Sequence, residues 1–175
     1  MNNQDFTKTF LDLLKPNQHV LDLGAGEGKF SRMFLERGTI VTAVDIRIPK
    51  QEEEKFRAVR MKIEDYCNTP NTEKYNRFFL RNVIQFLDKN WVFEILFPWI
   101  ENHSSDSSIV AIETFYQDPE PPFDHPMRSL YSLDELTLHF MTWVEHFARQ
   151  YSHMGLDMGG QTRKFFLSSL IVQKP

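Results

Sequence analysis

Cysteine is almost absent from this sequence of 175 residues, in which Cys67 is the single example. One thiol can form no disulfide within the chain and cannot supply a metal centre that needs several cysteines. A chain with so little cysteine is typical of a reducing compartment. We therefore expect a cytoplasmic protein.

Long apolar runs are also missing. No stretch approaches the roughly 18 consecutive apolar residues that a membrane-spanning helix requires. The first ten residues, MNNQDFTKTF, lack the basic segment followed by an apolar segment that marks a secretory signal peptide. We expect a soluble protein without a membrane partner, as a monomer or homodimer.

An excess of basic charge is absent as well. The formal net charge is −4, whereas general nucleic-acid binders neutralise phosphates with a strongly basic surface. We therefore expect no nucleic-acid partner. The six histidines show no spacing typical of metal ligands, and we expect no metal site: His19, His103, His125, His139, His146 and His153.

Short apolar runs alternate with segments of helical periodicity along most of the chain. The pattern predicts strands over 19–23, 39–46, 56–63, 75–83 and 107–115. It predicts helices over 1–16, 27–37 and 48–55, a helix around 91–99 that Pro98 kinks or ends, and a helix from the capping box at Ser132 to about 141. Residues 67–74 and 117–129 are predicted to be irregular.

The end of the chain shows a different pattern. Two long strand candidates, 144–153 and 164–172, are separated by a glycine-rich segment and predict an antiparallel hairpin. Strands that alternate with helices and end in a hairpin indicate an α/β fold. We expect one domain over 1–175, with a seven-stranded sheet that is mostly parallel and has an antiparallel C-terminal hairpin.

The segment LDLGAGEGKF, residues 21–30, places three glycines directly after the first strand. Such a turn lies at the carboxyl end of a parallel sheet, where ligands bind. A phosphate loop would need Ser or Thr after Gly28-Lys29, but Phe30 follows. A dinucleotide fingerprint would need a third glycine at position 29, which is Lys29. The spacing is G-x-G-x-G and fits neither ligand.

Asp22 lies two residues before the first glycine. A carboxylate there would repel a pyrophosphate, whereas it suits a ligand with positive charge. Opposite charges about 4 Å apart attract by roughly 4 kcal/mol at an effective dielectric constant near 20. The alternative is that Asp22 only caps the N–H groups of the turn. S-Adenosylmethionine has a sulfonium and an ammonium group, and these positive charges would be attracted to the carboxylate of Asp22.

Three segments carry a resemblance to a known family. The segment VLDLGAGEG (20–28) resembles the first motif of class I S-adenosylmethionine-dependent methyltransferases. VTAVDIR (41–47) and YNRFFLRNVIQFL (75–87) are similar to later motifs. The tail resembles that of the small tellurite-resistance-type methyltransferases. The resemblance implies a Rossmann-like, doubly wound sheet and S-adenosyl-L-methionine as cofactor, with S-adenosyl-L-homocysteine as product.

The resemblance also implies which residues contact the cofactor. Asp45 would hold the ribose hydroxyls, and the backbone near Arg81 would meet the methionine end. Lys62 replaces the aspartate usual for the adenine contact, so Glu64 or Asp65 would take over this contact and Ile63 would pack on the ring. The implied cofactor-binding residues are Asp22, Gly24, Ala25, Gly26, Asp45, Ile46, Ile63, Glu64, Arg81 and Asn82.

The methyl donor is already activated, so positioning and exclusion of water can provide much of the catalysis. No catalytic residue is identified by a motif. The candidates are Tyr116 and His125; with Phe123, His125 lies in the proline-rich segment 117–129, which we expect to form a lid over the substrate pocket. The alternative is that His125 is an ordinary solvent-exposed histidine in a surface loop.

These observations favour a methyltransferase that acts on a small molecule. Two alternatives are a methyltransferase acting on a macromolecule and a catalytically silent module that binds the cofactor. A nicotinamide-dependent oxidoreductase is disfavoured by Lys29 and Asp22.

Overall fold

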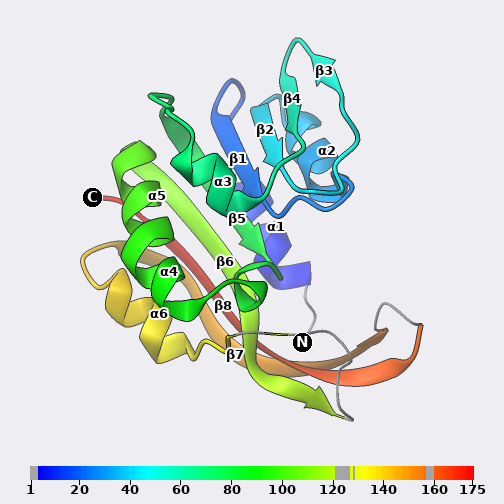
Figure 1. The fold of residues 1–175 in the computed structure, drawn as a ribbon. Coiled ribbons are helices and arrows are strands. Elements are labelled where there is room, and N and C mark those ends of the chain that lie inside the picture. Colours follow the sequence, from blue (N-terminus) through cyan, green and yellow to red (C-terminus); the bar gives the residue numbers. More distant parts are fainter. Residues whose placement is uncertain (1–3, 121–126, 128, 157–159) are drawn as a thin grey trace.

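One eight-stranded sheet forms the centre of the computed structural model, which describes residues 4–120, 127, 129–156 and 160–175 (Figure 1). The strand order is β3-β4-β2-β1-β5-β6-β8-β7. The strands are β1 (His19–Leu23), β2 (Ile40–Val44), β3 (Glu52–Glu53), β4 (Phe56–Val59), β5 (Tyr75–Arg81), β6 (Ser104–Glu120), β7 (Val144–Leu156) and β8 (Thr162–Gln173).

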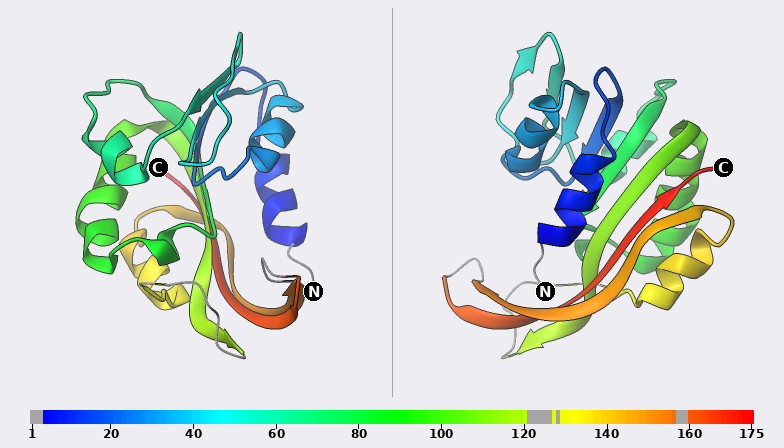
Figure 2. Two further views of the ribbon diagram at one scale, coloured as in Figure 1. Left: turned by 45° about the vertical axis from the view of Figure 1, so that its right-hand side comes forward. Right: turned by 180° about the vertical axis from the view of Figure 1, so that it is seen from behind.

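The pairing confirms the predicted architecture. Strands β4, β2, β1, β5 and β6 are parallel to one another, and β8 and β7 add an antiparallel hairpin to β6. The eighth strand, β3, is a two-residue antiparallel edge that the sequence pattern did not predict. The last part of β6 and the hairpin extend past the other strands and curl away from them (Figure 2).

Helices cover both faces of the sheet because its central strands are apolar on both sides. On one face, α1 and α2 pack with Val20, Val41 and Phe79. On the other face, the remaining helices pack with Leu21, Phe78 and Val110. The helical segments are α1 (Gln4–Asp12), α2 (Lys29–Leu35), α3 (Ile63–Asn68), η1 (Ile84–Phe86), α4 (Lys89–Trp91), η2 (Val92–Leu96), α5 (Phe97–His103) and α6 (Leu133–His139).

Three predictions around β4 were wrong. Residues 48–55 form no helix, because the acidic run around β3 offers no apolar stripe to bury. The third strand ends at Val59 rather than at residue 63, and the predicted loop 67–74 begins inside α3. Ile63, Tyr66 and Cys67 are buried at helical spacing, which stabilises a helix there.

Proline had less effect on regular structure than predicted. Pro98 lies in the first turn of α5, and a π-helical segment, η2, directly precedes it, so the chain continues without a break from α4 to α5. Strand β6 continues to Glu120, although 117–129 was predicted to be irregular throughout. Its pairing with β8 shifts register between Gln117 and Glu120, around Pro119, where a missing N–H is tolerated.

The capping box was predicted correctly, whereas the N-terminal helix ends at Asp12 rather than at residue 16. Helix α1 buries Phe6 and Phe10, and Ser132 accepts a hydrogen bond from the backbone of Glu135 while Glu135 accepts one from Ser132. Among the described residues, no helix is long and apolar enough to cross a membrane.

Candidate functional site

The turn after β1 leaves no room for a side chain at Gly24. Gly24 has φ +80°, and a Cβ atom there would lie 2.4 Å from Cγ2 of Val83. Gly26 and Gly28 also have positive φ, at +60° and +87°. The backbone N–H groups of Gly24 and Ala25 both point to the carbonyl oxygen of Val44, which fixes the turn against the end of β2. The glycines therefore bring the backbone close to whatever lies above the strand ends.

Asp45 fastens this turn from the end of β2. Its Oδ2 accepts the N–H of Gly26 at 2.9 Å, and its Oδ1 accepts the N–H of Arg47 at 2.8 Å. Nε of Arg47 also lies 3.5 Å from Oδ1, in an ion pair. A carboxylate has about four acceptor positions, so Asp45 can still accept hydrogen bonds from a ligand. The side chain keeps about 10% of its surface exposed, and Asp45 lines a cavity beside the turn.

Asp22 lies deeper, at the end of β1. It is 2% exposed, and its Oδ2 accepts a hydrogen bond of 2.6 Å from Oγ of Ser31 in α2. Burial raises the pKa of Asp22 from 3.8 to about 7, while the Ser31 hydrogen bond opposes the rise and nearby Asp45 adds to it. A cation beside this carboxyl group would favour its ionised form.

Two adjoining cavities meet above the turn. The β4-side cavity has a volume of about 480 Å³ and the hairpin-side cavity about 550 Å³. Both are at the carboxyl ends of the parallel strands, where ligands bind in open α/β sheets. The residues that line both cavities are Gly24, Arg47, Asn82 and Phe86.

The β4-side cavity joins apolar and charged side chains. Ile46 is 57% exposed, which is unusual for so large an apolar residue, and Ile63 and Met61 continue the apolar surface. Lys62 and Glu64 line the same cavity. Of the two acidic residues considered for an adenine contact, the structure places Glu64 at the cavity, whereas Asp65 is exposed and is absent from the lining among the described residues.

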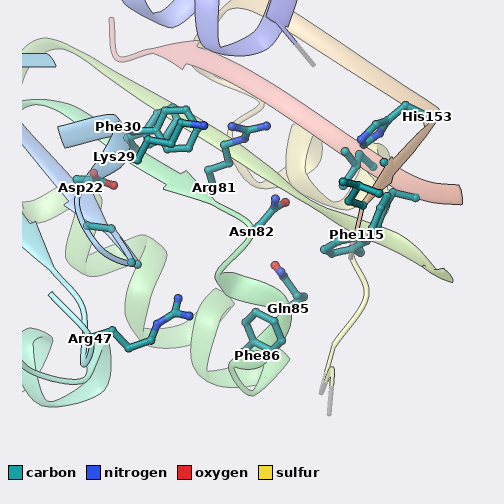
Figure 3. Close-up of a pocket in the computed structure, with 18 residues that line it drawn as sticks. Asp22, Lys29, Phe30, Arg47, Arg81, Asn82, Gln85, Phe86, Phe115 and His153 are labelled. Atoms are coloured by element: carbon teal, nitrogen blue, oxygen red, sulfur yellow. The ribbon is translucent and has the colours of Figure 1, made fainter. Parts of the chain in front are cut away.

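The hairpin-side cavity extends from the glycine turn to the C-terminal hairpin. In Figure 3, Asp22 and Phe30 lie at one end, Phe115 and His153 lie at the other, and Asn82 lies between them. Aromatic rings make up much of the wall: Phe30, Phe79, Phe86, Phe115, Phe165 and His153. His153 stacks on Phe165 with ring centres 5.5 Å apart, and burial lowers the pKa of the imidazole.

Arg81 is held at the cavity by a buried carboxylate. Its Nε lies 2.7 Å from Oε1 of Glu113, which is fully buried, and its guanidinium lies over Phe30 at 4.7 Å from the ring centre. Oε2 of Glu113 accepts hydrogen bonds from Tyr151 and Ser169. One carboxylate thus ties β5 to β6, β7 and β8 and fixes the direction of Arg81.

The structure brings all ten residues of the predicted cofactor site to one of these two cavities. Tyr116 is different: its ring packs on Phe166, and Phe115 lines the cavity in its place because neighbouring strand residues face opposite sides. Phe123 and His125 lie outside the described residues, as does most of the predicted lid.

Sequence reasoning missed His153, Gln85 and Phe115. His153 and Phe115 lie more than 80 residues after the glycine turn, and no local pattern links them to it. Gln85 offered a signal, because it is one polar residue in the apolar run VIQFL. A polar side chain at a buried position of this kind requires a partner.

Comparison with known proteins agrees with this geometry. Residues 4–105 match the model of the family described as FtsJ-like methyltransferase. The resemblance to S-adenosylmethionine-dependent methyltransferases, first stated from the motifs, is thereby confirmed. No protein of curated function matches the sequence.

Solved structures show the same fold at low sequence identity. TehB from Haemophilus influenzae is 18% identical with a TM-score of 0.77; the match covers 99% of this chain and 63% of that protein. A SAM-dependent methyltransferase from Archaeoglobus fulgidus is 16% identical with a TM-score of 0.71, over 98% of this chain and 92% of the other. The 1,6-didemethyltoxoflavin-N1-methyltransferase of Burkholderia thailandensis, solved with bound 1,6-didemethyltoxoflavin and S-adenosylhomocysteine, is 18% identical with a TM-score of 0.68; the match covers 98% of this chain and 78% of that protein.

Proposed function

Since this chain belongs to the family of FtsJ-like methyltransferases, we propose that it is a single-domain enzyme that methylates a small molecule. The methyl donor is S-adenosyl-L-methionine. The observation that supports a small acceptor is the hairpin-side cavity, an aromatic-lined space of about 550 Å³ that adjoins the glycine turn. A cavity of this size is in the range that holds a small ligand.

The β4-side cavity fits the adenosine part of the donor. The free acceptor positions of Asp45 suit two neighbouring ribose hydroxyls. The exposed surface of Ile46 suits the face of a base, with Ile63 and Glu64 nearby. The glycine turn leaves the room that the chain of the cofactor needs, because a single Cβ at Gly24 would collide with Val83.

The methionine part fits the end of the hairpin-side cavity near Asp22. The carboxyl group of Asp22 suits an ammonium group, and the guanidinium of Arg81 suits a carboxylate. The bound cofactor supplies a methyl group on a sulfonium, which needs no further activation. The residues of the chain would orient the two reactants and exclude water.

The far end of the hairpin-side cavity suits the methyl acceptor. Phe115 and Phe165 present apolar ring surfaces there. The pKa of His153 is lowered by burial, so its imidazole is neutral at pH 7 and can accept a proton from an acceptor that loses one. We propose His153 as this proton acceptor, in place of Tyr116 and His125.

The experiment is a calorimetric titration of the protein with S-adenosylhomocysteine and, in parallel, with NAD. We expect micromolar or tighter binding of S-adenosylhomocysteine and none of NAD. Asp45→Ala should weaken the binding by about 2 to 4 kcal/mol, since two hydrogen bonds to a charged group are lost. Glu53→Ala, an exposed change on β3, is the matched control. Tighter binding of NAD, or an unchanged affinity in Asp45→Ala, would refute the assignment.

A transfer assay separates an active enzyme from a silent binding module. Protein that binds S-adenosylhomocysteine is incubated with the labelled donor and a panel of small aromatic compounds. Label in a compound of the panel supports the proposal. Label transferred only to RNA or protein from a cell extract would show a macromolecular acceptor, and no transfer to any acceptor would indicate a silent module.

A further inference from the structure

Gln85 is a fully buried polar residue at the hairpin-side cavity. It lies in η1, the short turn that follows β5, and lines the cavity beside Phe86. Figure 3 shows its side chain among Asn82, Phe86 and Phe115. Gln85 therefore lies next to the boundary between the two cavities, where the methyl donor and the methyl acceptor would meet.

The two ends of the Gln85 amide differ in their environment. Oγ1 of Thr114 donates a hydrogen bond of 3.2 Å to Oε1 of Gln85. Among the described residues, Nε2 has no hydrogen-bond partner, although it is buried. In this orientation of the amide, Oε1 accepts from a hydroxyl on β6 and the N–H groups are unsatisfied. Buried donors in folded proteins normally have a partner, so an absent ligand would account for this one.

The same cavity contains many donors and few acceptors. Lys29, Arg47 and Arg81 reach it with cationic groups. Lys29 lies at the same end as Asp22, whose carboxyl group accepts a hydrogen bond from Ser31. At the other end, Nε2 is itself a donor without a partner among the described residues, so a ligand that offers it an acceptor atom is favoured over one that offers an N–H.

The walls near Gln85 restrict the shape of such a ligand. Phe86, Phe115 and Phe165 present rings, and His153 stacks on Phe165. Flat aromatic molecules bury most surface between ring faces.

We propose that Gln85 determines the specificity for the methyl acceptor: its Nε2 donates a hydrogen bond to a ring nitrogen or carbonyl oxygen of a planar aromatic molecule. Thr114 is the positioning residue that holds the amide in this orientation. The inference rests on the proposed function, because it assigns the acceptor end of the same site.

The test compares two flat probes that differ in their polar group. Quinoline offers a ring-nitrogen acceptor, and indole offers an N–H donor. Their dissociation constants are measured by ligand-observed NMR on protein saturated with S-adenosylhomocysteine. The wild type should prefer quinoline by about five- to tenfold, the range expected for one hydrogen bond to a buried donor. Gln85→Met, which keeps the length of the side chain, should abolish this preference and leave the S-adenosylhomocysteine affinity unchanged.

Two further variants keep the test decisive. Thr114→Val releases the amide, so the preference should fall without loss of the cofactor product; this variant carries the test if Gln85→Met does not fold. Gln117→Met, an exposed change on β6, should keep the preference. Equal binding of both probes to the wild type, or a preference that survives both Gln85→Met and Thr114→Val, would overturn the assignment. Failure of the wild type to bind S-adenosylhomocysteine would instead refute the proposed function.

Discussion

A carboxyl group with a pKa near 7 changes its charge in the pH range in which most proteins function. Asp22 is such a group, because its burial disfavours the ionised form more than Ser31 can compensate. In the unfolded chain, the same group would lose its proton near pH 3.8. The unfolded state therefore releases the proton first, and the folded state loses stability as the pH rises from about 4 to 7. The full loss is on the order of 4 kcal/mol.

Asp22→Asn removes this ionisation and keeps the shape of the side chain and an acceptor for Ser31. We expect the substitution to raise the free energy of unfolding more at pH 8 than at pH 5, by on the order of 2 kcal/mol. Urea unfolding at both pH values measures this difference, with exposed Asp106→Asn as the control. The same variant should weaken S-adenosylhomocysteine binding. An equal effect on stability at both pH values would show that Asp22 is not held protonated in the folded protein.

Gly24 and Gly26 have the same residue type and similar φ, but different surroundings. Gly24→Ala combines an unfavourable φ with an overlap against the branched carbon of Val83, so it should destabilise the fold by about 2 to 4 kcal/mol. Gly26→Ala meets only the flexible end of Arg47 at 3.6 Å and should cost about 1 kcal/mol. Denaturant midpoints give both values.

A double variant separates the two causes at Gly24. Gly24→Ala combined with Val83→Ala should recover the part of the loss due to the overlap, and keep the part due to φ. If Gly24→Ala and Gly26→Ala destabilise the protein equally, contact with Val83 does not limit the turn.

At the scale of elements, the β7–β8 hairpin acts as a wall of the site as well as an edge of the sheet. Gly155 in β7 lies against this wall: a Cβ there would be 3.1 Å from Phe165 and 3.2 Å from the ring of His153. A side chain at position 155 would therefore displace the rings of Phe165 and His153, which line the cavity.

Gly155→Val should push these two rings out of their positions in the wall. We expect it to weaken quinoline binding by about tenfold, or roughly 1.4 kcal/mol, while S-adenosylhomocysteine binds as before through the β4-side cavity and the glycine turn. NMR titration and calorimetry measure the two affinities. Ser152→Val, at an exposed position of the same strand, serves as the control. Loss of both affinities together would contradict separate roles for the two ends of the site.

Local sequence patterns predicted most helices and strands. They failed where a contact with a distant residue or an irregular helical turn determines the secondary structure. Helix α1 and the hairpin follow from apolar spacing that is visible within ten residues. The continuation of the helix through Pro98 depends on a π-helical turn, which has no composition of its own. Strand β3 has two residues and forms only because β4 lies beside it.

At the scale of the whole molecule, the sequence predicted one end of the site better than the other. Asp22, Gly24 and Asp45 lie at the ends of two neighbouring strands, so the order of elements along the chain already brings them together. The acceptor end is assembled from β5, β6, β7 and β8, which are far apart in sequence. The residues that line the acceptor end can be predicted only if the register of the hairpin against β6 is known. This register is set by pairing between strands that are distant in sequence.

The burial of Glu113 has a consequence for behaviour in concentrated salt. Dissolved ions weaken contacts between exposed charges, such as Lys8 with Asp12, whose side chains are 75% and 52% exposed. They cannot reach the fully buried carboxylate that holds Arg81. Rising ionic strength should therefore weaken ion pairs at the surface well before it changes the shape of the pocket. Salt would then affect the rate at which the protein associates with charged ligands more than the geometry of the bound state.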